Sequence, residues 1–129
     1  MKLVVQINAS PHQYQATATA YHFTVAALNK GHEVVRVFFY HDGVLNALPH
    51  SEASADETQW RERWSSLASQ HALDLVVCVS SAQRRGVFQA HGQGAEPVDQ
   101  QLAAGFRIAG LGLLMEAAMD ADRLVVFGV

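Results

Sequence analysis

The residues best suited to chemistry in this chain are a cysteine and the polar residues that closely follow it: Cys78, Ser80, Ser81, Arg84 and Arg85. Cys78 closes the apolar run that starts at Leu73, which is typical of a buried parallel strand, and the polar segment after it indicates the first turn of a helix. A thiol at such a junction faces the positive end of a helix dipole, with two guanidinium groups close in sequence. Both features favour the thiolate, the nucleophilic form of cysteine. The segment therefore makes Cys78 a candidate catalytic residue, with the serines and arginines as supporting candidates.

A structural interpretation of Cys78 stays open beside the catalytic one, because free cysteine is among the most frequently buried residue types. Cys78 is the only cysteine of the chain, which excludes an intrachain disulfide, a CxxC redox pair and a cysteine-rich zinc site. Position alone does not decide between the two interpretations.

The segments around Cys78 alternate between strand-like and helix-like patterns. Strands are predicted at 3–7, 33–40, 73–78 and 123–127, with a short strand-like element at Ile108. Helices are predicted at 16–30, 44–48, 56–71, 79–85 and 112–119, and residues 88–106 should be loop in large part. This rhythm predicts one α/β domain over residues 1–129, a three-layer α/β/α fold with a mostly parallel sheet of about five strands.

The loops that follow the first two strands should lie near Cys78, because ligands and catalytic groups gather at the carboxyl ends of parallel strands. These loops carry His12, Tyr40 and His41. We therefore expect three loops to meet at the thiol, with these side chains as its neighbours and the thiol itself at least partly exposed.

Composition and motifs exclude several classes of protein. A net charge of −3 and a charged fraction of 16% are wrong for a general nucleic-acid binder. The seven histidines form no HxH or HxxxH pair, which argues against a metal site. The loop after the first strand, Asn8–Gln15, has no glycine and matches neither a dinucleotide-binding fingerprint nor a P-loop. We expect no metal and no cofactor.

The N-terminal sequence lacks the long apolar region and the cleavage site of a signal peptide, and no segment approaches the length of a membrane span. These features predict a soluble protein of the cytoplasm that does not associate with membranes.

Cys78 and Arg84 also show the Cys-x5-Arg spacing of the phosphate loop in cysteine-dependent phosphatases. That loop favours glycines, and the intervening residues 79–83 contain none. No Asp-Pro pair is present to suggest a general-acid loop. The segment is better explained as continuous helix, which makes the phosphatase match accidental.

Several short motifs, in a fixed order along nearly the whole chain, are together more specific than any one of them. They are Gly31–Val34, Val37–Tyr40, Gly43-Val44, Val77–Val79, Arg84–Val87, Gly105-Phe106, Gly110–Gly112, Glu116-Ala117 and Asp122-Arg123. In this order and spacing the chain resembles the DsrE/TusD-like sulfur-relay proteins. It is most similar to the TusD branch, whose members carry a cysteine at the position of Cys78.

The resemblance implies a sulfurtransferase that accepts sulfane sulfur as a persulfide on Cys78 and passes it on for 2-thiouridine formation at the wobble position of certain tRNAs. Thiol–persulfide exchange needs a thiolate and an accessible sulfur, but no metal and no second cysteine. Two alternatives remain: the sulfur trafficking of the DsrE branch in sulfur oxidation, and a scaffold subunit in which Cys78 is dispensable.

The resemblance also implies partners. TusD-like chains assemble with TusB- and TusC-like sister subunits as a heterohexamer, receive sulfur from a TusA-like donor and deliver it to a TusE-like acceptor. Stable binding of nucleic acid by this chain itself is not expected. The apolar-rich segments 37–40 and 105–114 are candidate interface surfaces, and a core role for them is an equally good interpretation.

Overall fold

A computed structural model describes residues 1–11, 14–47, 59–86 and 102–128. Its centre is a five-stranded sheet in the order β4-β3-β2-β1-β5, with every neighbouring pair parallel. The strands are β1 (Lys2–Ile7), β2 (Glu33–Phe39), β3 (Leu75–Cys78), β4 (Phe106–Ala109) and β5 (Arg123–Phe127). The predicted α/β class and the predicted parallel sheet of about five strands are confirmed.

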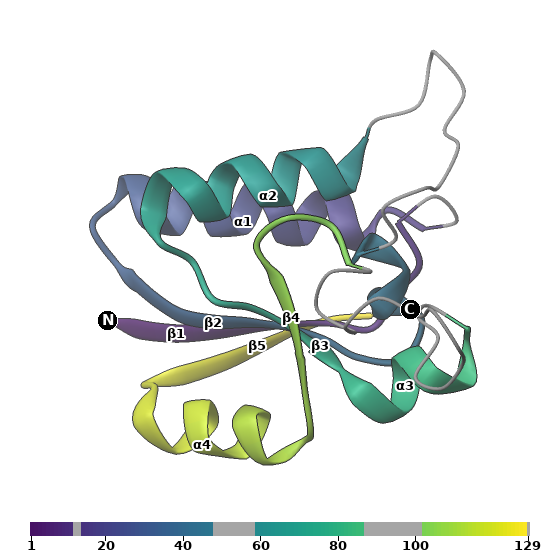
Figure 1. Cartoon of the computed structure of the whole chain (residues 1–129). Helices are drawn as coiled ribbons and strands as arrows, with labels where there is room; N and C mark the ends of the chain where they lie inside the picture. The colour runs from purple at the N-terminus through teal and green to yellow at the C-terminus, as the bar shows by residue number, and fades with distance from the viewer. Residues whose placement is uncertain (12–13, 48–58, 87–101, 129) are drawn as a thin grey trace.

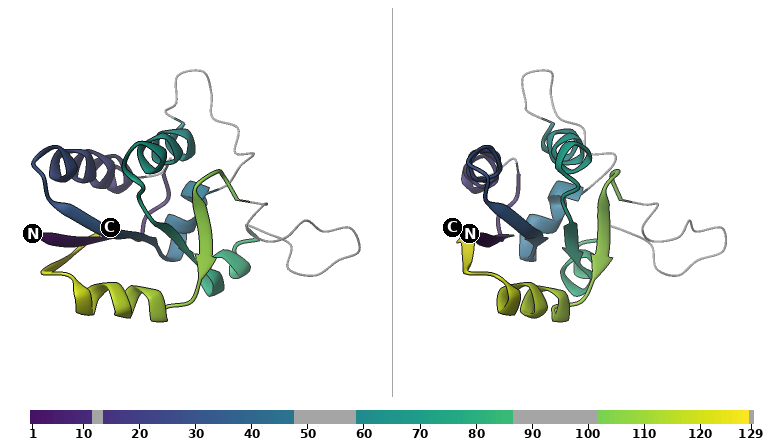
Figure 2. Two further views of the ribbon diagram at one scale, coloured as in Figure 1. Left: turned by 60° about the vertical axis from the view of Figure 1, so that its left-hand side comes forward. Right: turned by 90° about the vertical axis from the view of Figure 1, so that its left-hand side faces the viewer.

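Helices cover both faces of the sheet (Figures 1 and 2). Helices α1 (Ala16–Asn29) and α2 (Trp60–His71) lie on one face, and α3 (Val79–Arg84) and α4 (Gly112–Asp120) lie on the other. A 3-10 helix, η1 (His41–Ala47), follows the carboxyl end of β2. None of the helices in these described ranges has the length and apolar character needed to cross a bilayer.

The core forms where the central strands meet α1 and α2. Because β2 and β3 are sandwiched between helices, their carboxyl halves are almost wholly apolar, and all four residues of β3 are at most 1% exposed. Trp64 of α2 packs edge-on against Phe39 of β2, with ring centroids 5.5 Å apart. Trp64 is fully buried, which makes it a packing residue of the core.

The observed boundaries differ from the predicted ones mainly near β3 and η1. The chain turns at Ala72, which has a left-handed backbone (φ 53°), so β3 begins at Leu75 rather than Leu73. The helix predicted at 44–48 begins earlier, because η1 starts at His41. The predicted helix start at Asp56, residue 48 and most of the predicted 88–106 loop lie outside the described residues.

For the segment 37–40, the core interpretation holds over its first three residues and the interface interpretation does not. Val37, Phe38 and Phe39 are 0% exposed, because β2 has a strand on each side and a helical layer on each face. In the second segment, 105–114, the exposed large apolar side chain is Leu111, at 45%.

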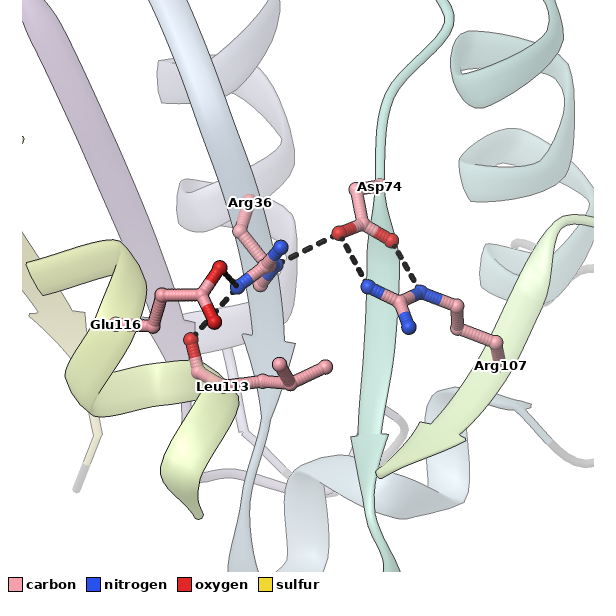
Figure 3. Close-up of polar contacts among 5 residues, drawn as sticks. All are labelled: Arg36, Asp74, Arg107, Leu113 and Glu116. Atoms are coloured by element: carbon pink, nitrogen blue, oxygen red, sulfur yellow. Dashed lines mark hydrogen bonds and ion pairs between the residues drawn. The ribbon is translucent and has the colours of Figure 1, made fainter. Parts of the chain in front are cut away.

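The Asp74 carboxylate joins three neighbouring strands (Figure 3). Asp74 immediately precedes β3, and its Oδ2 accepts a hydrogen bond of 2.6 Å from Nε of Arg36 in β2. Its Oδ1 accepts one of 2.7 Å from Nε of Arg107 in β4, which also donates to Oδ2 through Nη2 at 2.9 Å. Arg36 further donates from Nη1 to the carbonyl oxygen of Leu113 in α4, at 2.8 Å. One carboxylate thus ties β3 to β2 and β4, and through Arg36 to α4.

The pKa of Asp74 is lowered below its ordinary value of 3.8, chiefly by the hydrogen bonds from Arg107. Partial burial opposes this shift, and the hydrogen bond from Arg36 and the charges of both arginines add to it. Glu116, 3.9 Å from Arg36, has a side chain that is 70% exposed, so its ion pair contributes little. The main electrostatic stabilisation in this cluster comes from Asp74.

Asp74→Ala should lower the free energy of unfolding by about 2 kcal/mol, because it removes the carboxylate that two guanidinium groups share. The pH dependence follows from the lowered pKa. The stabilisation is fully present above pH 3.8 and is lost as the pH falls through the folded-state value. Urea denaturation should therefore show a constant difference between native protein and Asp74→Asn near neutral pH, which shrinks below pH 3.8.

The matched control is Asp120→Asn, which removes an exposed ion pair with Lys2 of 3.5 Å. It should change the free energy of unfolding very little. An Asp74 variant no less stable than this control would refute the role of Asp74 as the link between strands.

Candidate functional site

Cys78 lies where the sequence predicted it, at the carboxyl end of a parallel strand and at the start of a helix. It is the last residue of β3, pairs with Ala109 of β4 and is the N-cap residue of α3, with extended backbone angles (φ −64°, ψ 120°). Residues 79–84 form a continuous helix. They do not form a loop curled around a phosphate, which agrees with treating the Cys-x5-Arg spacing as accidental.

The expectation of a partly exposed thiol is wrong for this conformation, because Cys78 is 1% exposed. Two arrangements account for the burial. Strand β3 is paired on both edges, by β2 and β4. In addition, η1 packs against both β3 and α3, so the carboxyl end of β3 is covered. A reagent cannot reach the sulfur until part of this cover moves.

Hydrogen bonds join the end of β1 to the end of β2, and the start of η1 to α3. The backbone N–H of Tyr40 donates to the carbonyl oxygen of Ile7, the last residue of β1, at 2.9 Å. The next N–H, of His41, donates to the hydroxyl oxygen of Ser81 in α3 at 3.1 Å. The rings of Tyr40 and His41 lie 3.9 Å apart between centroids. His12 lies outside the described residues.

The supporting serines and arginines have different surroundings. Ser81 is buried and accepts the hydrogen bond from His41, whereas Ser80 and Arg84 are exposed. Arg85 pairs with Asp42 of η1, with 2.7 Å between Nε and Oδ1, and donates from Nη1 to the carbonyl oxygen of Ser81 at 3.2 Å. Sequence reasoning missed Asp42, although it lies in the turn that was expected to approach the thiol.

Helix η1 is held tightly against the end of β1. A Cβ atom added at Gly43 would overlap the carbonyl oxygen of Ile7, so only glycine permits this approach. Val44 and Ala47 are 0% exposed. Asn46 donates from Nδ2 to the carbonyl oxygen of Gly43 at 2.8 Å and to the hydroxyl of Thr17 in α1 at 3.4 Å. These contacts fix η1 and, with it, the wall over Cys78.

Within the described ranges, no group of three histidine, cysteine or carboxylate side chains is placed to hold a metal ion. The polar atoms that contact one another around Cys78 come from η1 and α3. The arrangement is suited to chemistry on the thiol itself.

Gly43→Ala should destabilise the protein by about 2 kcal/mol, because the methyl group must push η1 away from β1. Urea denaturation measures this loss. Gly110→Ala is the control, since a Cβ there would meet nothing within 4 Å. Equal effects of the two substitutions would show that the approach of η1 to β1 is not tight.

The fold and the position of the cysteine define an α/β protein with a thiol at the carboxyl edge of an all-parallel sheet. The model of the DsrE/DsrF-like family matches residues 1–127, and the chain belongs to this family.

Relatives of known name match nearly the whole chain. The protein named "Putative sulfurtransferase DsrE" of Allochromatium vinosum is 50% identical over 131 residues, 99% of each chain. A "Sulfurtransferase TusD homolog" of Pseudomonas aeruginosa is 42% identical, covering 99% of this chain and 98% of the relative. The "Sulfurtransferase TusD" of Serratia proteamaculans is 45% identical over 88% of each.

A solved structure supports the fold alone. The ychN protein of E. coli superposes with a TM-score of 0.80 over 98% of this chain and 99% of that one, at 17% sequence identity.

Proposed function

We propose that this protein is a sulfurtransferase that carries sulfane sulfur as a persulfide on Cys78. The observation that supports this most strongly is the similarity, over nearly the whole chain, to proteins named sulfurtransferase. Cys78 is the only thiol the chain can offer for such a reaction, and it lies at the edge of the sheet where α/β proteins place reactive groups.

The transfer is a redox-neutral exchange in two steps. The Cys78 thiolate attacks the outer sulfur of a donor persulfide, so that a new S–S bond forms on Cys78 while the donor's S–S bond breaks. The donor then leaves as a thiolate. In the second step an acceptor thiolate attacks the outer sulfur of the Cys78 persulfide, and Cys78 is the leaving thiolate. No external oxidant or reductant is consumed.

The burial of Cys78 has two opposite consequences for a carrier. An S–S bond that is out of contact with solvent is protected from free thiols, because exchange depends on access to the sulfur. The same burial requires an opening step when a true partner docks. Arg84, Arg85, Ser80, Tyr40 and His41 remain the proposed surroundings of the reacting sulfur, together with Ser81.

We place this carrier in the relay that supplies sulfur for wobble 2-thiouridine in tRNA, because several relatives bear the TusD name at 36–45% identity. The 50% identity to the DsrE protein of Allochromatium vinosum favours a second candidate, DsrE-type trafficking in sulfur oxidation. Both use the same persulfide chemistry at Cys78 and differ in the protein that accepts the sulfur. Cytoplasmic location and a role without direct nucleic-acid binding belong to the same proposal.

The test of sulfur carriage is intact-mass spectrometry after incubation with a cysteine desulfurase, cysteine and a TusA-like donor. The native chain should gain one sulfur atom, which a small thiol removes. Cys78→Ala and Cys78→Ser should gain none, because exchange passes through a covalent bond to the attacking sulfur. Both variants must retain the native circular dichroism spectrum, since a buried position is being changed.

A native chain that never gains sulfur, while the donor is shown to be loaded, would contradict the proposal. Dependence of aryl phosphate hydrolysis on Cys78 and Arg84 would instead support a phosphatase. A scaffold subunit would show neither reaction.

The partners proposed for this chain are TusB- and TusC-like sister subunits, a TusA-like donor and a TusE-like acceptor. Apolar exposure supports an assembly: Met115 and Met119 of α4 are 62% and 86% exposed, and Leu124 and Val126 of β5 are 42% and 50% exposed. Strand β5 is at an edge of the described sheet. Exposed apolar side chains thus lie on α4 and on the edge strand β5, and exposed apolar surface of this kind marks protein interaction sites.

Light scattering at micromolar concentration should find a species larger than the 14.1 kDa chain, either alone or with the sister subunits. Met115→Glu with Met119→Glu should weaken that assembly, because burying two carboxylates is unfavourable. Ser69→Glu with Gln70→Glu adds the same charge to exposed positions on α2 and should leave it intact. A 14.1 kDa species under all these conditions would contradict the proposed assembly.

A further inference from the structure

The burial of Cys78 conflicts with any reaction at its sulfur, because thiol exchange requires access. We propose that α3 is a movable cover over Cys78, held closed on η1 by a latch. We define the latch as the Asp42–Arg85 ion pair and the hydrogen bond from the His41 N–H to the Ser81 hydroxyl. This inference rests on the proposed function, and it assigns Asp42, Ser81 and Arg85 as positioning residues for the sulfur chemistry.

The element that opens must be the one held least firmly, and β3 and η1 are both held firmly. Strand β3 is hydrogen-bonded on both edges and wholly buried. Helix η1 is held by two fully buried side chains, Val44 and Ala47, by the close approach of Gly43 to β1, and by the carbonyl oxygen of Ala47, which accepts from the N–H of Ala103 at 3.0 Å.

Within the described ranges, helix α3 is held less firmly than β3 and η1. It has six residues, of which Ser81 and Ala82 are buried. Helices this short have almost no stability of their own in water, so α3 depends on its contacts with neighbouring elements. A displacement of α3 from η1 would uncover the N-cap position, which is Cys78 itself.

The Asp42–Arg85 ion pair is weak enough to break and re-form while the rest of the fold stays intact. The side chains of Arg85 and Asp42 are 26% and 52% exposed. Their 2.7 Å ion pair is therefore in contact with solvent, and added salt weakens it. Arg85 also donates to the carbonyl oxygen of Ser81, so its side chain contacts both α3 and, through Asp42, η1. Loss of such a pair should raise the open population by about two- to five-fold. A docking partner that offers its own carboxylate to Arg85 would open α3 in the same way.

Asp42 and Arg85 could also act on the thiol through their charges. The direction in which each substitution changes thiol reactivity distinguishes this role from the latch. If Asp42 and Arg85 acted only through their charges on the thiolate, removing the anion and removing the cation would change thiol reactivity in opposite directions. If they act as a latch, removing either one opens α3, and both variants become more reactive.

The experiment measures the rate at which iodoacetamide, an uncharged reagent, alkylates Cys78 in the native chain, followed by intact mass. Asp42→Asn and Arg85→Gln should each raise the rate by about two- to five-fold, and the swapped pair Asp42→Arg with Arg85→Asp should return it toward the native value. The increase should persist on the high-pH plateau of the rate, where all of the thiol is ionised. Asp120→Asn, which removes the exposed pair with Lys2, should leave the rate unchanged.

Opposite changes in the two single variants, or no change in either, would overturn the latch. So would an alkylation rate that follows global unfolding, which a steep dependence on low concentrations of urea would reveal. Alkylation uses no sulfur donor, so its outcome is independent of sulfur carriage. If both single variants are alkylated faster but the native chain never accepts sulfur, the proposed function is contradicted and the latch is still supported.

Discussion

The bidentate contact between Asp74 and Arg107, with Arg36 on the other side of the carboxylate, is the interaction on which the position of the site depends. Strand β3 has four residues, all apolar or cysteine, and apolar pairing specifies strand register poorly when a strand is buried on both faces. The Asp74 carboxylate can contact Arg36 on β2 and Arg107 on β4 together in only one register of β3 against these strands. Because Asp74 immediately precedes β3 and Cys78 is its last residue, fixing the position of Asp74 fixes that of Cys78.

From that position the rest of the site follows. The carboxyl end of β3 adjoins η1, which Gly43 allows to approach the end of β1 closely. The thiol is therefore enclosed in the described conformation, and the enclosure has opposite effects on the two requirements of a sulfur carrier. It protects an S–S bond from stray thiols, and it delays exchange with the intended partner. If α3 moves while β3 and η1 stay in place, the closed state protects the S–S bond and the open state lets the partner reach it.

The fold was largely predictable from the sequence because its signals are local. The apolar runs at 3–7 and 123–127 and the helix that ends before Gly31 can be recognised within a few residues, and the structure agrees with them. The position of Cys78 at a strand end followed from the same patterns. The burial of its sulfur did not, because it depends on the packing of β3 and α3 against η1, a segment more than thirty residues earlier in the chain.

The same limit applies to the ion pairs. Asp42 and Arg85 are 43 residues apart, and Arg36 and Asp74 are 38 apart. No periodicity or spacing in one sequence links such partners. Arg84 and Arg85 look equivalent in the sequence, whereas in the fold Arg84 is exposed and Arg85 is bound to Asp42. The topology of the sheet, which brings the ends of β2 and β3 together, creates that difference.

The central claim is that the Cys78 persulfide is the species that hands sulfur onward. The most direct measurement is rapid quenching of a single turnover, with a persulfide-loaded donor and a thiol acceptor protein, followed by mass analysis of the Cys78 peptide. The account predicts that the Cys78 persulfide forms and decays at least as fast as sulfur reaches the acceptor. A persulfide that forms more slowly than the acceptor is loaded, or transfer that continues undiminished in Cys78→Ala, would contradict it.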